Sequence, residues 1–409
     1  LLLSVGNQTG LAQGYWDGST SGIVGCSTCT SDPQTGMIDT HWKYTYSLSI
    51  PSTWVSGDYL VKLTDQTGAE GYINFILRDD ERRSSLLAQV AVNTYQAYNN
   101  WGGYSLYAAP AKGQIAGYGA KPAVKVSFNR PIVSMDPFKI FYDVQAVRFL
   151  ERSEYDVSYT TSVAVDQNPG RLSGHKAFIS IGHDEYWTRA MRDGVEQARD
   201  QGVNLAFWGG NDVYWQARLE PDLAGNPRRV LVVYRDAALD PLAASDPKNA
   251  TVRFIDPPVS HPQNSLTGTI FGGIIENPPG VPWVVAPTAP ADLLEGTGLQ
   301  PGTSVPALTG KECDSVAGDD SGPAGLQVMA ASPMLTNDGQ HIVCDTTLYQ
   351  ASSGAWVFNA GTLSWTMALD GFGHHNPGLG EEPPIQRLTQ NVLALFGVQP
   401  AVILQSPVQ

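Results

Sequence analysis

The chain has 409 residues, a formal net charge of −14 and a pI near 4.8, and 42% of its residues are hydrophobic. This composition supports a sizeable core in one large domain or two smaller ones, and it excludes a globally disordered chain. The acidic balance argues against nucleic acid and anionic membrane surfaces as partners, because both repel negative charge. No stretch approaches the ~20 consecutive apolar residues that a membrane span requires.

Residues 1–84 are predicted to be all-β. Three segments in this part alternate apolar and polar residues and are separated by turn residues: KYTYSLSI, GDYLVKLTD and GYINFILRD. Such alternation is typical of strands with one buried face, and several short strands in succession favour an antiparallel sandwich. The charged run RDDERR at 78–83 marks the expected end of this domain.

Residues 85–409 are predicted to form an α/β domain. Its expected strands are LLAQVAVNT, AVKVSF, YDVSYTT, HKAFISIG and GVNLAFWGG. Apolar spacing predicts helices in FYDVQAVRFLE, TRAMRDGVEQARDQG and IQRLTQNVLALFG, the last two ending at Gly202 and Gly397. Strands that alternate with helices indicate a mostly parallel sheet covered on both faces. The Pro- and Gly-rich residues 240–310 are expected to form an insertion with few helices.

The four cysteines favour disulfides. An even count in a Lys-poor chain rich in Ser, Thr and Gly is typical of an oxidising compartment, so we expect an extracellular or periplasmic protein. Three pairings are open, and we favour Cys26–Cys29 with Cys313–Cys344. The competing zinc site needs two close pairs or nearby His, whereas Cys313 and Cys344 lie far apart in sequence. A redox role for CSTC lacks the preceding strand and the following helix.

Two further features concern processing. Because the sequence starts at Leu1 rather than Met, we expect a processed or trimmed chain. Asn7 and Asn249 lie in N-x-S/T acceptors and are predicted glycan sites if the source glycosylates exported proteins, although such triplets also arise by chance.

Polar and aromatic side chains follow three of the expected strands. In open α/β sheets, ligands bind beyond the carboxyl ends of the strands, so these residues are expected to line one pocket. They are Tyr95, Tyr98 and Tyr107 after the first strand, His183, Asp184 and Glu185 after AFISIG, and Asn211, Asp212 and Tyr214 after NLAFWGG. Simpler interpretations remain open: the aromatic loop packs, Asp184 caps the helix that begins near Thr188, and GGN forms a tight turn.

The absence of several catalytic motifs limits the reactions that these strand-end residues could catalyse. The sequence around Ser180 is not G-x-S-x-G, no phosphate-binding Gly-rich loop follows the first α/β strand, and no H-E-x-x-H is present. What remains is a set of oxygen ligands together with a histidine. Hard oxygen donors suit an oxophilic metal that activates water or polarises a carbonyl.

The sequence resembles a known family. The segments NTYQAYNNWGGYSLY, FYDVQAVRFLERSEYDVSY, ISIGHDEYW, NLAFWGGNDVYW, LTGKECD and SGAWVFNAGTLSW are similar, in order, to the catalytic region of the N,N-dimethylformamidase large subunit and its relatives. GHDEYW and FWGGN are the most specific parts. The resemblance implies an α/β plus all-β chain: an immunoglobulin-like sandwich over 1–84, then a glutamine-amidotransferase-like α/β sheet domain over 85–409.

The resemblance also implies a metal site. The family enzyme is an amidohydrolase with one iron held by two Tyr and one Glu, so the expected cofactor is mononuclear Fe(III). Glu185 matches the carboxylate ligand, and Tyr98 and Tyr142 resemble the two phenolates, with Tyr95 and Tyr107 as nearby competitors. Ferric iron prefers anionic oxygens and lowers the pKa of a phenol.

Three further residues match polar positions of the family site: His183, Asn211 and the acid/base candidate Glu312. The expected function is therefore iron-dependent hydrolysis of an amide or related C–N bond in a small molecule, with metal-activated water attacking a polarised carbonyl. The expected geometry places the Glu185 carboxylate beside the hydroxyls of Tyr98 and Tyr142, with Asp184 turned away as a helix cap.

Two departures from the family keep an alternative open. The family's large subunit is longer and works with a small helical partner chain, and the expected export is unusual for a cytoplasmic amidase. The alternative is a secreted structural protein that assembles as a homo-oligomer, filament or coat, or a carbohydrate-binding protein with Trp- and Tyr-rich loops, either of which keeps the fold without turnover.

Overall fold

The structure is a computed structural model, and it describes most of the chain. The described residues are 30–40, 42, 46–64, 66–68, 70–107, 121–132, 138–276, 280–319, 321–372 and 378–400. Cys26, Cys29 and Asn7 lie outside them, so the predictions for these three residues stay predictions. Among the described residues, no helix combines the length and the apolar character needed to cross a bilayer.

A seven-stranded sheet forms the centre of the molecule, in the order β15-β16-β17-β8-β6-β3-β5. Five of its strands, from β17 to β5, run parallel, and β16 and β15 extend the sheet as an antiparallel hairpin. The strands are β3 (Leu86–Val90), β5 (Val157–Thr161), β6 (Ala177–Ile181), β8 (Asn204–Trp208), β15 (Gln327–Leu335), β16 (His341–Gln350) and β17 (Trp356–Asn359). The mixed α/β class expected from the sequence is confirmed.

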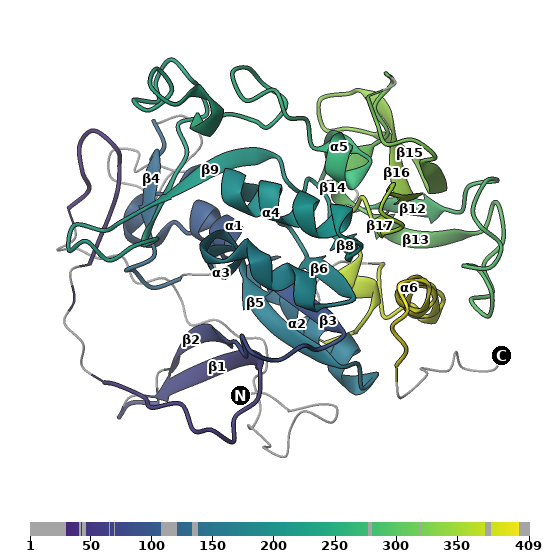
Figure 1. The fold of residues 1–409 in the computed structure, drawn as a ribbon, viewed down its shortest axis with the longest axis horizontal. Coiled ribbons are helices and arrows are strands. Elements are labelled where there is room, and N and C mark those ends of the chain that lie inside the picture. Colours follow the sequence, from purple (N-terminus) through teal and green to yellow (C-terminus); the bar gives the residue numbers. More distant parts are fainter. Residues whose placement is uncertain are drawn as a thin grey trace.

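Helices cover both faces of this sheet, as expected (Figure 1). The helical elements are α1 (Val92–Tyr98), η1 (Trp101–Gly103), α2 (Phe138–Arg152), α3 (Ser162–Gln167), η2 (Pro169–Gly174), α4 (Arg189–Asp200), η3 (Pro247–Asn249), α5 (Asn264–Thr267), η4 (Thr366–Ala368) and α6 (Pro383–Leu395). Alternate residues of β6 separate the two layers: Phe178 packs in the layer of α4, whereas Ile179 and Ile181 pack in the layer of α2 and α6. The three longest helices agree with those expected from apolar spacing.

Smaller sheets flank the centre. They contain β4 (Lys125–Ser127), β7 (Tyr186–Thr188), β9 (Trp215–Glu220), β10 (Val230–Val232), β11 (Ile270–Ile275), β12 (Val281–Val284), β13 (Ser304–Thr309) and β14 (Lys311–Ser315). The segment AVKVSF, which we expected in the parallel sheet, instead pairs antiparallel with β10 in the sheet β4-β10-β9-β7. The insertion at 240–310 contains only short helical elements, as expected, but it also contributes β11, β12 and β13.

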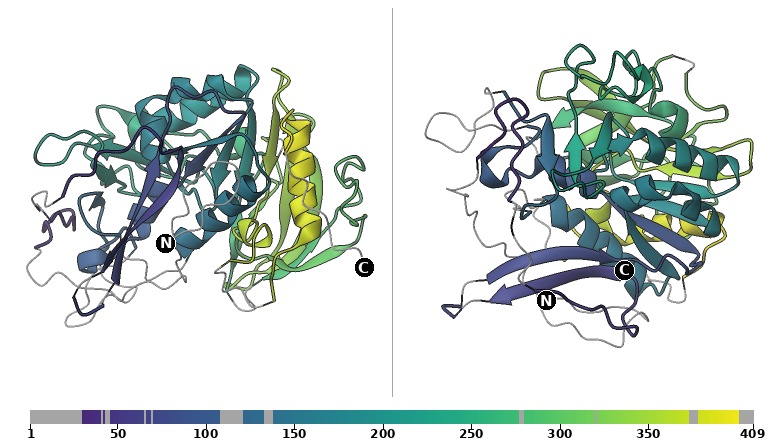
Figure 2. Two further views of the ribbon diagram at one scale, coloured as in Figure 1. Left: turned by 90° about the horizontal axis from the view of Figure 1, so that it is seen from below. Right: turned by 60° about the vertical axis from the view of Figure 1, so that its left-hand side comes forward.

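The N-terminal part packs on the central sheet as a hairpin. β1 (Gly57–Thr64) pairs antiparallel with β2 (Glu70–Leu77), and the two strands lie side by side along one side of the α/β part (Figure 2). The Ser56 hydroxyl accepts a hydrogen bond from the backbone N–H of Tyr159 on β5 at 2.9 Å. In the described part of residues 1–84 this is the one strand pair and there is no helix. The immunoglobulin-like sandwich and the amidotransferase-like sheet type stay predictions.

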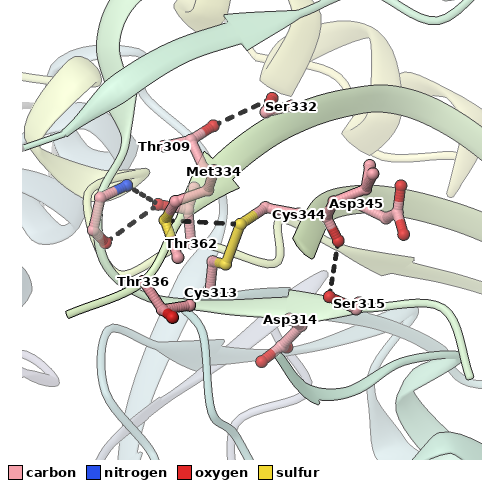
Figure 3. The surroundings of a disulfide bond; sticks show 12 residues. Thr309, Cys313, Asp314, Ser315, Ser332, Met334, Thr336, Cys344, Asp345 and Thr362 are labelled. Carbon is pink, nitrogen blue, oxygen red and sulfur yellow. Dashed lines mark hydrogen bonds between the residues drawn. A yellow bond between two sulfur atoms is a disulfide. The ribbon is translucent and has the colours of Figure 1, made fainter. Parts of the chain in front are cut away.

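A disulfide ties one small sheet to the central sheet. Cys313 on β14 is bonded to Cys344 on β16, with Cα atoms 5.7 Å apart (Figure 3). Both cysteines pack among Ile275 and Met334 in a small buried cluster. The prediction of this pair is confirmed, and it fixes the position of the strand that carries Glu312.

Candidate active site

The carboxyl ends of three parallel strands deliver side chains to one place. β3 leads into α1, which ends at Tyr98; β6 leads into the turn that carries His183 and Glu185; β8 leads into the turn that carries Asn211. A fourth contribution comes from β14, where the backbone carbonyl of Glu312 accepts a hydrogen bond from Leu363. We call Tyr98, Tyr107, His183, Glu185, Asn211 and Glu312 the rim cluster.

The Glu185 carboxylate is the centre of the rim cluster. Its side chain is buried, and the Tyr98 hydroxyl donates to Oε2 at 2.9 Å. The Tyr107 hydroxyl donates to Oε1 at 2.8 Å and to Oε2 at 2.9 Å. The two phenol rings are stacked, with centroids 4.2 Å apart, so that both hydroxyls reach the same carboxylate. The Glu185 backbone N–H is held by the Thr94 hydroxyl at 3.0 Å.

His183 stands between two carboxylates. Its Nε2 lies 3.3 Å from Glu185 Oε2 and 3.7 Å from Glu312 Oε1, and it also faces the Tyr98 hydroxyl at 3.3 Å. Its Nδ1 faces the Gly210 carbonyl at 3.1 Å, which fixes the ring orientation. Burial by itself would lower the pKa of His183, but the carboxylates of Glu312 and Glu185 outweigh it and raise that pKa to about 10.

Asn211 holds Glu312 in place. The Asn211 side-chain amide donates to Glu312 Oε2 at 2.7 Å, and its backbone N–H donates to Asp314 Oδ1 at 2.7 Å. Asn211 has a φ of 54°, in the left-handed region that non-glycine residues seldom occupy. Such strain persists only where surrounding contacts over-determine the conformation, and it is common at functional sites.

Burial governs the protonation of the remaining groups. It raises the pKa of both Tyr98 and Tyr107 well above the usual value, and the nearby Glu185 carboxylate adds to this effect. Burial also raises the pKa of Glu312, partly offset by His183. In the absence of a bound cation, both phenols therefore keep their protons and share them with Glu185.

Two glycines allow the turns of the site to touch. A Cβ at Gly209 would lie 1.7 Å from the Gly182 carbonyl oxygen, so the turns after β6 and β8 meet backbone to backbone. Gly182 has a φ of 68°, and a Cβ there would lie 2.6 Å from Cβ of Tyr142. Glycine is therefore required at both positions.

Tyr142, which the resemblance implies as a phenolate ligand, lies against the Gly182 turn, and its role as a ligand stays a prediction. It lies on α2, is 2% exposed and packs in the core layer beneath the sheet with Ile181 and Trp208. The second phenol that donates to Glu185 in this structure is Tyr107. The competitor Tyr95 points elsewhere, because its hydroxyl donates to the Asp143 carboxylate.

The expectation that Asp184 caps a helix is wrong. The N-cap of α4 is Thr188, whose side chain accepts from Met191 N. Asp184 instead turns into the sheet, where its Oδ2 accepts from the Ser180 hydroxyl at 2.7 Å and from the Gln89 amide at 2.5 Å. Burial raises its pKa to about 6. Because the Asp184 side chain is fixed toward the strands of the sheet, its neighbours His183 and Glu185 point away from the sheet, toward the site.

The sequence did not predict a role for Tyr186 or Arg235, which lie next to Tyr107. The Tyr186 hydroxyl donates to the Tyr107 oxygen at 2.6 Å, and Arg235 Nη2 donates to the Tyr186 oxygen at 2.8 Å. Arg235 follows β10, in a sheet whose pairing with the site was not predictable from local pattern. Tyr186 was visible only as the neighbour of Glu185 in GHDEYW.

A second group of ligand-type residues lies on the outside of α4. Ligand atoms of Asp193, Glu196 and His261 lie within 4.8 Å of one another, and we call these three residues the outer cluster. Arg192 donates to Glu196 at 2.8 Å, and His261 Nε2 lies 3.0 Å from the same oxygen, Oε1. The central carboxylate is therefore already neutralised by side chains of the protein.

Comparison with known proteins agrees with the resemblance found in the sequence. The family model described as N,N-dimethylformamidase beta subunit-like, C-terminal, matches residues 5–378. No curated protein is matched. Since the match spans nearly the whole chain and includes every residue of the rim cluster, the chain belongs to the N,N-dimethylformamidase beta subunit-like family, in its C-terminal region.

Proposed function

We propose that the protein is an iron-dependent hydrolase of an amide or related C–N bond. The observation that carries this proposal is the convergence of the Tyr98 and Tyr107 hydroxyls on the Glu185 carboxylate, at 2.8–2.9 Å, beside His183. Family membership supports amide hydrolysis in general. The metal and the residue roles are our proposal.

The donor set fits a ferric ion. Three groups with hard oxygen atoms, Tyr98, Tyr107 and Glu185, lie close enough together to bind one cation, and the two phenols become anionic on losing the protons that they donate to the Glu185 carboxylate. Binding would release those protons, so iron occupancy should fall in acid. We therefore propose Tyr107 as the second phenolate in place of Tyr142.

When bound, the iron supplies Lewis-acid polarisation of an amide carbonyl and lowers the pKa of water. The rim cluster supplies the proton transfers. His183 can donate a proton at Nε2, because the two carboxylates that face this nitrogen favour the protonated imidazole and Gly210 holds the other nitrogen. Glu312, oriented by Asn211, stabilises the protonated imidazole and is positioned to return a proton toward the leaving amine.

Two matched variants test this ligand set. Tyr107→Phe should lose iron and lose amine release from a panel of small amides, because one of three anionic ligands is removed. Tyr142→Phe, a change of the same size in the core, should keep both iron and activity. The reverse pattern would overturn the ligand set, and wild-type protein that binds iron but releases amine from none of the amides would overturn the hydrolase.

The carbohydrate-binding alternative gains no support from the loop NNWGGYSLY. Trp101 is 5% exposed, and the rings of Tyr98 and Tyr107 are engaged with each other and with Glu185. Extracellular or periplasmic location stays a proposal, which the Cys313–Cys344 disulfide supports. Glycosylation of Asn249 also stays a prediction; its amide donates to Asp246 at 2.6 Å.

A further inference from the structure

Arg235 lies at the end of a directed chain of hydrogen bonds that leads to Glu185. Arg235 Nη2 donates to the Tyr186 oxygen at 2.8 Å, Tyr186 donates to Tyr107 at 2.6 Å, and Tyr107 donates to Glu185 at 2.8 Å. Each donor in such a chain polarises the next, so the positive charge at one end strengthens every bond toward the carboxylate.

The same guanidinium also contacts the Tyr107 ring directly. The Arg235 carbon Cζ lies 4.5 Å from the centroid of Tyr107 and 5.2 Å from that of Trp215. A cation over an aromatic face is attracted by the ring, and more strongly once the ring carries negative charge. Tyr107 is therefore held at its face by Arg235 and at its oxygen by Tyr186, which accepts in turn from Arg235.

The position of Arg235 is itself fixed. Its Nη1 donates to the Leu106 carbonyl, next to Tyr107, and its backbone N–H donates to the Thr251 carbonyl at 2.8 Å. Its φ is 63°, a left-handed value that costs energy for any side chain other than glycine. Among the described residues, no carboxylate forms an ion pair with Arg235 within 4.0 Å. The positive charge of Arg235 therefore faces the rings of Tyr107 and Trp215 and the hydroxyl of Tyr186.

The two phenols on Glu185 consequently have different neighbours. The Tyr98 hydroxyl faces the imidazole of His183 at 3.3 Å, whereas Tyr107 faces Arg235. We propose that Arg235 is a positioning residue that holds the Tyr107 oxygen on the metal side of Glu185 and stabilises its negative charge when it serves as a ligand. This inference rests on the proposed iron site.

Three variants separate the contributions. Arg235→Gln removes the positive charge. Arg235→Lys keeps the charge but loses the planar guanidinium with its several N–H donors. Tyr186→Phe removes only the hydroxyl that links Arg235 to Tyr107. Arg253→Gln is the matched control, because Arg253 also lies over a tyrosine ring, that of Tyr214 at 5.9 Å, but pairs with Asp256. Ferric ion is titrated into each metal-free protein, and affinity and visible spectrum are recorded.

We expect Arg235→Gln to bind ferric ion at least roughly tenfold more weakly, the scale of losing one charge-assisted interaction. Its phenolate-to-iron absorption should move to longer wavelength, because removing the cation raises the energy of the phenolate electrons. Arg235→Lys should restore part of both. Tyr186→Phe should lose affinity but keep most of the band position, since the cation still covers the ring.

The outcomes distinguish this inference from the proposed function. If wild-type protein binds no ferric ion and shows no colour, the iron site is wrong and the role of Arg235 falls with it. If wild type is coloured but Arg235→Gln matches Arg253→Gln in affinity and band position, only the role of Arg235 is overturned. If Arg235→Gln does not fold, the Lys and Phe variants decide: wild-type affinity in both overturns the proposal.

Discussion

The rim cluster and the outer cluster both place a histidine beside carboxylates, yet their surroundings differ. His183 Nε2 lies 3.3 Å from Glu185 and 3.7 Å from Glu312, and His261 Nε2 lies 3.0 Å from Glu196. In the outer cluster, Arg192 supplies a permanent cation to the carboxylate. In the rim cluster, the carboxylate receives two phenol hydroxyls instead.

This difference favours the rim cluster over the outer cluster as the site of the proposed iron. The outer cluster satisfies its own charge, is partly exposed and lies mainly on one helix. The rim cluster is more enclosed, with Glu185 and Asn211 buried and its other members half-buried. It draws on four separate segments and contains phenols that gain negative charge only if a cation replaces their protons. We therefore assign chemistry to the rim cluster and structure to the outer cluster.

The largest effect is expected from Glu185→Gln, which keeps the size of the side chain but removes the charge. Iron binding should weaken by more than about 100-fold, beyond the range seen for loss of an outer-sphere partner, while the fold is kept. Glu196→Gln in the outer cluster is the control and should keep full iron content. Elemental analysis of both variants measures this, and equal iron in the two would remove the distinction between the clusters.

Glu312→Gln should separate proton transfer from metal binding. Because Glu312 faces His183 rather than the phenols, the variant should retain iron but lose about 10²- to 10⁴-fold in kcat, the usual contribution of a general acid or base. Glu295→Gln, at an exposed carboxylate, should be unaffected. A loss of iron in proportion to activity would instead place Glu312 among the ligands.

Cys344→Ala tests whether the rim cluster depends on long-range anchoring. The disulfide closes a sequence separation of 31 residues and holds β14, which carries Glu312, to the central sheet. Its loss should lower the free energy of unfolding by about 3–4 kcal/mol in the chain-entropy model, measured by urea denaturation. Unchanged unfolding and unchanged kcat would show that β14 is fixed by its strand pairing alone.

The smallest effect is expected at the outer cluster. Burial alone would raise the pKa of Glu196, but His261 and Arg192 outweigh it and lower that pKa to about 2. A lowered folded-state pKa stabilises the protein above the unfolded value of 4.5, and this is lost as the pH falls through about 2. Glu196→Gln should therefore lower the free energy of unfolding by about 1–3 kcal/mol, and only above this window, because it leaves the fully buried Arg192 without its charged partner. Thermal unfolding at pH 7 and pH 2 checks this; an equal cost at both would contradict it.

The sequence predicted those parts of the molecule that depend on local pattern. Strands β3, β6 and β8 are short apolar runs, and α4 ends at Asp200, just before Gly202, which has a φ of 99°. His183 and Glu185 were placed correctly on one side of the turn, because residues two apart after a strand share a face. The Cys313–Cys344 pair followed from an even count and an inferred compartment.

What the sequence could not predict depends on tertiary packing. Tyr142 and Tyr107 both precede Glu185 in sequence, and only the packing of α2 against the sheet shows which ring enters the core and which reaches the carboxylate. AVKVSF reads as a strand, but its partner β10 is set more than 100 residues later. Arg235 has no local signal, because its role arises from contacts with Tyr107, Tyr186 and Trp215, which come from other segments.

The central claim is that Tyr98, Tyr107 and Glu185 hold one iron. Elemental analysis of the purified wild-type protein, combined with its visible spectrum, tests this most directly. We predict close to one iron per chain and a phenolate-to-Fe(III) charge-transfer band, which Tyr107→Phe should remove or shift and Tyr142→Phe should leave unchanged. Colourless protein without iron after growth and purification with added iron would contradict it.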